Sequence, residues 1–292
     1  MRKGDRTMLK QKKKGRIWRG LITVLLCLSV FATTVLGVLQ LGVVYTARAW
    51  KQWSPDYQKV DLTPILNQQT LSEEDYQTLY KQTGLTKLGI DGFLQKNDIQ
   101  GILSVQEFFF AKHTVTADKF AMFTYLEEIE AYAPMAVLED GDILVSATTR
   151  VSWWRYGHAS LVIDGEGKRI LESLAPGYES EINHARAFAC LANFLVLRPK
   201  LDKETRAQVA SYAKENLIGI PYQMTTGILS KKYNPDELKR SQCAHLVWYA
   251  YKQFGVDLDS TGGLVVKPQD MANSEHLEVV QAFGFDLDTL WS

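Results

Sequence analysis

The sequence has little of what would assign it to a specialised class of protein. It contains three cysteines among 292 residues, no internal repeat, and no low-complexity tract beyond a short basic N-terminus. Few cysteines exclude a small disulfide-stapled scaffold, and the lack of a repeat excludes a solenoid or a propeller. Cys27 lies in an apolar run, so Cys190 and Cys243 could form at most one disulfide. A composition of 46% hydrophobic and 23% charged residues instead indicates a globular domain with a sizeable core.

The chain also lacks net charge, but its basic and acidic residues are unevenly distributed. Nine Lys and Arg residues fall within the first twenty positions, whereas the chain after Ala49 has 23 basic and 32 acidic residues. Binding to a nucleic-acid backbone depends on clustered Lys and Arg. The acidic body therefore argues against a nucleic-acid partner.

One long uncharged run follows the basic N-terminus, from Leu21 to Ala47. Its 27 residues can cross a bilayer core of roughly 30 Å, and they exceed the roughly 7–15 apolar residues of a cleavable signal. We expect a signal-anchor at 21–47 with residues 1–20 in the cytoplasm and the remainder outside. Ala47-Arg48-Ala49 has the small-x-small form of a cleavage site, so release of the body is the alternative.

Residues 48–136 have a helical pattern without evident chemistry. Ser72 begins a capped helix that Gly84 ends, and further helices are predicted at Ile102–Phe110 and Thr116–Ala133. This segment could serve as a spacer, a lid or a docking surface, and the pattern does not distinguish among them.

Residues 137–292 predict an α+β domain. After Asp140-Gly141-Asp142 the pattern changes to strands, and Asp164-Gly165-Glu166-Gly167 predicts a hairpin turn between two of them. The predicted strands are 143–147, 159–163, 169–173, 194–197 and 277–285, with a helix capped by Asp202 that runs to Asn216. We therefore expect helices flanking one antiparallel sheet.

The predicted hairpin brings together two side chains with complementary chemistry. His158 stands at its head, and Glu172 lies within an apolar stretch of its return strand. Two adjacent antiparallel strands can place both side chains on one face, where a carboxylate would orient the imidazole as in a catalytic triad. Asp164 and Glu166 are weaker candidates because water can solvate them in the turn. A structural histidine at position 158 is the alternative.

Cys243 opens a strongly helical run after the polar stretch 231–240. Leu246, Val247 and Ala250 recur at helical spacing until Gly255 ends the run. The first turn of a helix favours thiolate over thiol and offers N–H groups to an oxyanion. Cys243 is therefore a candidate nucleophile, with a small buried cysteine that packs the helix start as the alternative.

Aromatic residues near these positions are candidates for a substrate site. Trp153, Trp154 and Tyr156 precede His158, and Tyr222 follows in a predicted turn. Packing in a core or an interface is their alternative role.

We expect no cofactor and no metal. A zinc site made of His158, Cys243 and His245 is disfavoured, because residues two apart on a helix point to different faces.

The motifs Gly141-Asp142-Ile143-Leu144, Gly157–Val162, Ile170–Ser173, Gly219–Tyr222 and Cys243–Trp248 occur with the histidine before the cysteine. In that order they resemble the circularly permuted papain-fold hydrolases, NlpC-superfamily relatives of the YiiX/YebB kind. The resemblance covers about half the chain, and it implies Cys243 as nucleophile, His158 as base and Glu172 as orienting carboxylate. It departs from the family at Ala244-His245, where a serine and then an acidic or amide residue often stand.

This resemblance implies attack of a thiolate on the acyl carbon of an amide or ester. Cell-wall peptide is the favoured substrate, because an anchored extracytoplasmic domain has access to it. An acyl lipid is the alternative, since the superfamily also resembles lecithin–retinol acyltransferases. A non-catalytic, membrane-anchored binding module remains open as well.

Overall fold

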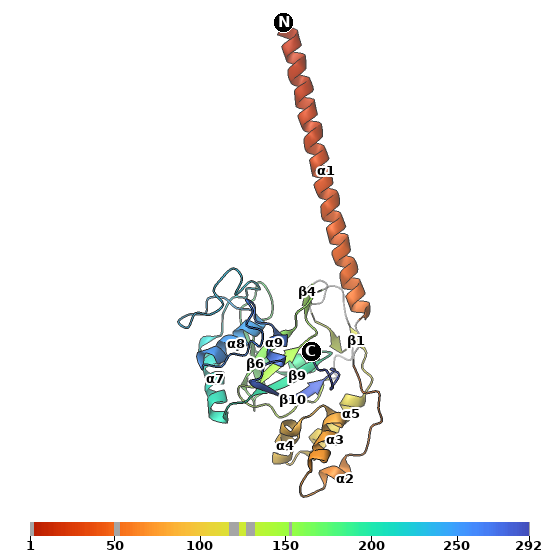
Figure 1. Ribbon diagram of the computed structural model, residues 1–292, viewed down its shortest axis with the longest axis vertical. Helices are drawn as coiled ribbons and strands as arrows, with labels where there is room; N and C mark the ends of the chain where they lie inside the picture. Colours follow the sequence, from red (N-terminus) through yellow and green to blue (C-terminus); the bar gives the residue numbers. More distant parts are fainter. Residues whose placement is uncertain (1–2, 50–52, 117–122, 127–131, 152–153, 292) are drawn as a thin grey trace. The chain divides into compact units, whose positions relative to one another are not determined.

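The computed structural model describes residues 3–49, 53–116, 123–126, 132–151 and 154–291. They form two compact units, Met1–Trp50 and Lys51–Ser292. The first unit is one helix, α1 (Lys3–Ala49), coloured red to orange in Figure 1. Within it, the 26 residues Ile17–Gly42 have a mean hydropathy of 2.5, which makes this stretch long and apolar enough to cross a membrane.

A six-stranded antiparallel sheet forms the centre of the second unit (Figure 1). Its strand order is β10-β9-β3-β6-β7-β8, and the inner strands are nearly all apolar because both faces are covered. The strands are β3 (Ile143–Ser146), β6 (His158–Asp164), β7 (Arg169–Glu172), β8 (Glu181–His184), β9 (Phe194–Pro199) and β10 (Leu277–Phe283). The prediction of an α+β class with an antiparallel sheet is confirmed.

One face of this sheet is covered by helices from the C-terminal half. They are α7 (Lys203–Asn216), α8 (Cys243–Gln253) and the short α9 (Pro268–Ala272). Ile143, Val145 and Leu161 alternate toward this face and share a core with Trp248 of α8. α7 begins as predicted, with the carboxylate of Asp202 accepting the N–H of Thr205.

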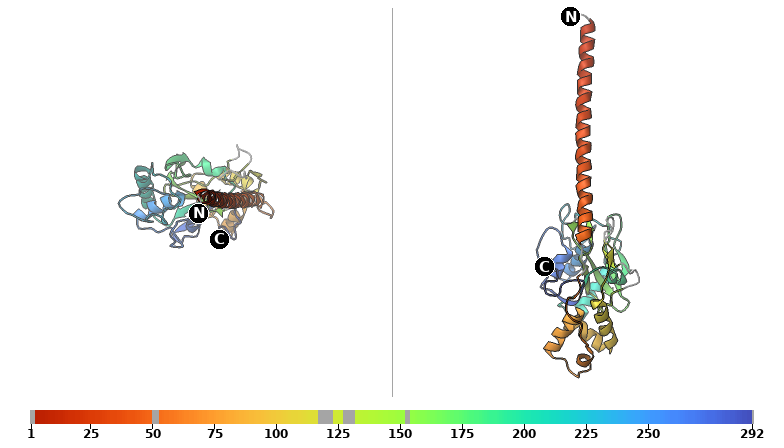
Figure 2. Two further views of the ribbon diagram at one scale, coloured as in Figure 1. Left: turned by 90° about the horizontal axis from the view of Figure 1, so that it is seen from above. Right: turned by 90° about the vertical axis from the view of Figure 1, so that its right-hand side faces the viewer.

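The opposite face is covered by helices from the N-terminal half (Figures 1 and 2). They are α2 (Thr63–Leu66), α3 (Glu73–Thr83), α4 (Lys87–Gln95) and α5 (Ile99–Phe110). Leu144, Val162 and Val196 point into the core that these helices form with the sheet. The predicted capping box at Ser72 is present, and Gly84 ends α3 with φ +70.

The predicted helix at Thr116–Ala133 is wrong for the residues that the structure describes. Thr116 belongs to β1 (Val115–Thr116), which pairs with β2 (Tyr125–Leu126). Valine, threonine and tyrosine favour strands, and the Leu126 N–H donates to the carbonyl of Cys190 at 2.9 Å, so partners distant in sequence override the helical pattern. Positions 117–122 and 127–131 of that prediction lie outside the described residues.

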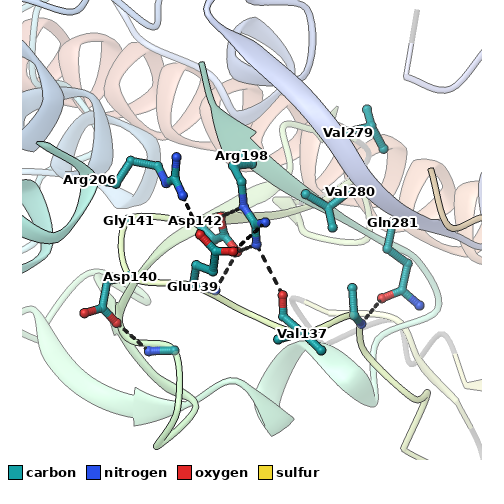
Figure 3. Close-up of polar contacts among 12 residues, drawn as sticks. Val137, Glu139, Asp140, Gly141, Asp142, Arg198, Arg206, Val279, Val280 and Gln281 are labelled. Carbon is teal, nitrogen blue, oxygen red and sulfur yellow. Dashed lines mark hydrogen bonds and ion pairs between the residues drawn. The ribbon is translucent and has the colours of Figure 1, made fainter. Parts of the chain in front are cut away.

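A buried polar cluster connects the start of β3 to its neighbour β9 and to the helices on one face of the sheet (Figure 3). Arg198 of β9 donates to both carboxylate oxygens of Asp142, at 2.8 and 2.7 Å, and to Glu139 at 2.9 Å. Arg206 of α7 also binds Glu139, and the hydroxyl of Tyr251 in α8 donates to the carbonyl of Gly141. The cluster thereby fixes β3, β9, α7 and α8 relative to one another.

Candidate active site

The hairpin of β6 and β7 places His158 beside Glu172. Leu161 pairs with Leu171 and Val162 with Ile170, a register that points both side chains to the same face of the sheet. Nε2 of His158 lies 2.7 Å from Oε2 of Glu172, and each residue is 2% exposed. The pair is therefore a fully desolvated hydrogen bond between an imidazole and a carboxylate.

Two further side chains donate hydrogen bonds to the Glu172 carboxylate. The hydroxyl of Ser160 lies 3.2 Å from Oε2, and the amide of Asn183 lies 2.8 Å from Oε1. Burial alone would raise the pKa of Glu172, but the hydrogen bonds with His158, Asn183 and Ser160 hold it below its ordinary value. The carboxylate is thus kept ionised.

Sequence reasoning missed both of these donors. Asn183 lies on β8, an edge strand that is half-exposed and polar. Such a strand lacks the hydrophobic alternation that reveals other strands. Ser160 could have been found, because it lies two residues after His158 and so on the same face of β6.

Cys243 is the first residue of α8, and the preceding residue caps the helix. Oε1 of Gln242 accepts the N–H of Ala244 at 2.9 Å, and its Nε2 donates to the carbonyl of Val266 at 2.6 Å. The sulfur of Cys243 lies 3.4 Å from the same Oε1, and the residue is 1% exposed. The cap thus fixes the thiol at the positive end of the helix dipole.

The thiol of Cys243 and the carboxylate of Glu172 share one imidazole. The side chain of Cys243 lies close enough to that of His158 to raise the pKa of the imidazole. Because Glu172 occupies Nε2, the other ring nitrogen, Nδ1, remains for the thiol. Burial lowers the pKa of His158, but the interactions with Cys243 and Glu172 outweigh it and raise the pKa to about 10. This direction favours the protonated imidazole.

Two aromatic rings hold the imidazole in place. The ring of Phe188 stacks on it at 5.4 Å between centroids, and that of Phe123 meets it edge-on at 5.5 Å. A pocket of about 460 Å³ opens beside these rings and is lined by His158, Glu172, Tyr125 and Arg186, among others. The pocket lies against the imidazole–carboxylate pair, of which each residue is 2% exposed.

Tyr156 and Tyr222 lie next to the thiol. Burial, followed by the proximity of Cys243, raises the pKa of both hydroxyls. Both therefore remain protonated donors at neutral pH. Trp153 lies outside the described residues, and of Trp154, in β5 (Trp154–Arg155), the structure describes the backbone.

His245 is occupied by structural contacts. Its Nδ1 lies 2.9 Å from the hydroxyl of Ser241 and its Nε2 2.6 Å from the carbonyl of Lys232. Burial lowers its pKa to about 4, so the ring is neutral. His245, where the sequence departs from the family that it resembles, thus fastens the loop that carries Lys232 to the start of α8. Among the described residues, no group of three or more His, Cys, Asp or Glu is placed to hold a metal.

Comparisons with family models, with curated proteins and with solved structures give no match. The arrangement of Cys243, His158 and Glu172 is therefore the basis for assigning a function.

Proposed function

We propose that the protein is a membrane-anchored cysteine hydrolase that cleaves an amide or ester acyl bond. One observation carries the proposal: a single buried imidazole lies between a thiol at a helix start and an ionised carboxylate on the neighbouring strand. A structural histidine needs one hydrogen-bond partner for each nitrogen. Here the imidazole is hydrogen-bonded to a carboxylate and interacts with a thiol, and acyl transfer requires such an orienting carboxylate and such a nucleophile.

In this mechanism the sulfur of Cys243, as thiolate, attacks the acyl carbon and pushes an electron pair onto the carbonyl oxygen. The tetrahedral intermediate collapses to a thioester, and the leaving nitrogen or oxygen takes the proton from the His158 imidazolium. Water then attacks the thioester while His158 accepts its proton, which releases the acid and regenerates the thiolate–imidazolium pair.

Stabilisation of the developing oxyanion is assigned to the tyrosine pair. The hydroxyls of Tyr156 and Tyr222 keep their protons and lie near the thiol. The N–H of Ala244 is already bound by Gln242 and cannot serve. Hydrogen-bond donors aimed at such an oxygen supply a large part of the rate enhancement in acyl transfer.

The order of these residues along the chain supports a permuted papain-like fold of the NlpC superfamily. The histidine and the acid come from consecutive strands, and the cysteine comes later, from a helix packed on the same antiparallel sheet. On this proposal, residues 137–292 are the hydrolase domain. Residues 48–136 contribute the helices that cover its second face.

The apolar helix within Ile17–Gly42 supports a single-span anchor. The basic residues before it favour a cytoplasmic N-terminus and an extracytoplasmic hydrolase domain. Cell-wall peptide then leads as substrate. An acyl lipid is the second candidate.

An acyl-type electrophilic thiol probe, such as a peptidyl acyloxymethyl ketone, tests the proposal on the full-length protein in membranes. Mass spectrometry of the digested protein should find the probe on Cys243, with labelling lost in His158→Ala and retained in the matched control Cys190→Ala. Panels of muropeptides and acyl lipids then identify the substrate. Equal labelling of Cys243 with and without His158 would refute the triad.

A further inference from the structure

Four exposed apolar side chains project from two loops beside α8. Met224, Ile228, Leu229 and Leu264 are 42%, 57%, 76% and 69% exposed. We call these four residues the apolar tip. Large apolar side chains scattered singly over a surface need no explanation, but a contiguous group of them marks an interaction site.

The two loops that carry the tip are fastened together. Gly227 adopts φ +92, and a Cβ there would lie 1.8 Å from the carbonyl oxygen of Leu264, so the two backbones are in direct contact. The ammonium of Lys232 binds the carboxylate of Asp259 and the carbonyl of Gly263, from one loop to the other. The tip is therefore one surface rather than two separate loop ends.

Cationic side chains lie beside this surface, because Lys231, Lys239 and Arg240 line one pocket with Leu229 and Glu237. Lys231, Lys239, Arg240 and Lys267 are exposed. Residues 223–240 carry four basic and two acidic side chains, although the chain after Ala49 is acidic overall, with 23 basic and 32 acidic residues. Exposed aliphatic side chains flanked by Lys and Arg match the interface of a bilayer that contains anionic headgroups.

We propose that the apolar tip docks on the surface of a bilayer with anionic headgroups. The proposal rests on the proposed function in one respect, namely that α1 anchors the chain to that bilayer. Backbone hydrogen bonds close the base of the first loop, since Gln223 N–H donates to Ser241 at 2.6 Å and Ser241 N–H to Pro221 at 3.1 Å. Tyr222 and Cys243 lie at this base, so docking holds the candidate site next to the membrane.

The test uses the full-length protein in lipid nanodiscs. In a background of Cys27→Ser, Cys190→Ser and Cys243→Ala, Leu229→Cys receives a fluorophore that responds to polarity. A matched protein carries the label at Thr70→Cys, an exposed position in the loop between α2 and α3. With a quencher in the lipid chains, we expect the label at position 229 to be quenched roughly threefold or more beyond that at position 70 in anionic discs, and less so in zwitterionic discs.

Charge reversal gives a second measurement. Lys231→Glu with Arg240→Glu should abolish the difference between anionic and zwitterionic discs, whereas the control pair Lys203→Glu with Lys214→Glu on α7 should keep it. Equal quenching at positions 229 and 70 overturns the proposal, and quenching that ignores headgroup charge does so as well. If the fluorophore at position 229 reports an apolar environment in detergent but is not quenched by the lipid quencher, a second copy of the chain covers the tip. That result also overturns the proposal.

Failure here can be separated from failure of the proposed hydrolase. The thiol probe, applied to the protein with Cys243 intact, measures the reactivity of Cys243. The quenching measures contact of the apolar tip with lipid. A reactive Cys243 with an unquenched tip removes the docking surface alone.

Discussion

Replacing Glu172 by glutamine should lower the pKa of His158 and weaken the site without unfolding the chain. The structure supplies the magnitude. The interval between the ordinary value of 6.5 and about 10 corresponds to about 5 kcal/mol, produced by Cys243 and Glu172 against the opposing effect of burial. Loss of one partner of a buried ion pair typically costs about 3–5 kcal/mol. We therefore expect His158 in Glu172→Gln to titrate between roughly 6 and 8.

The assay is NMR of the protein labelled at histidine Cε1, since the chain has five histidines. Loss of one signal in His158→Gln assigns the resonance. Because the folded pKa is raised, the stability that His158 contributes is complete below pH 6.5 and is lost as the pH rises through about 10. In Glu172→Gln this loss should occur at lower pH, as chemical denaturation at a series of pH values would show.

In Glu172→Gln, kcat should fall together with the pKa of His158. Once a substrate is known, we expect kcat of Glu172→Gln to drop by about 10- to 1,000-fold, because an orienting group supplies part of a triad's effect. Glu179→Gln and Asp164→Asn are matched controls that should leave both kcat and the titration unchanged. If His158 still titrates near 10 in Glu172→Gln, or if either control lowers its pKa, the carboxylate has been wrongly assigned.

The remaining predictions concern the anchor and the buried polar cluster. Protein with α1 intact should stay with membranes after a high-salt wash, because salt screens basic side chains but does not extract a spanning helix; a mature N-terminus at Trp50 in the soluble fraction would contradict this. Arg198→Met should lower the free energy of unfolding by about 3–5 kcal/mol, since it leaves Asp142 buried and unpaired, and an unchanged urea midpoint would count against the cluster. Gly141→Ala should cost about 1–3 kcal/mol in the same titration, because φ is +85 and the added Cβ would lie 2.8 Å from the Tyr251 hydroxyl; a loss below about 0.5 kcal/mol would contradict this account.

Most of the strands could be predicted from the sequence, because they are signalled locally. A turn of Asp and Gly between two apolar runs indicates the hairpin, and the hairpin's register brings His158 to Glu172. The contact between Cys243 and His158 is different, since it depends on how α8 packs on the sheet, and residue spacing does not encode that packing. It could be anticipated through the resemblance alone.

Two predictions failed for different physical reasons. β1 and β2 form where a helix was predicted, because the backbone at Leu126 finds its partner at Cys190. β8 was missed because an edge strand need not be apolar. Asn183 on that strand completes the environment of Glu172, so the least predictable strand also supplies part of the site.

The closed base of the loop at residues 223–240 has a consequence for engineering. Its two ends are held to each other by the hydrogen bonds between Gln223, Ser241 and Pro221, and within it the carbonyls of Lys232 and Asn234 bind His245 and Tyr249 of α8. Lengthening a surface loop of this kind costs little, because the entropy of closure grows only slowly with length. The exposed positions Asp236 and Glu237, beyond these contacts, are accordingly a suitable place to insert an epitope or a fluorescent peptide while the geometry around Cys243 is preserved.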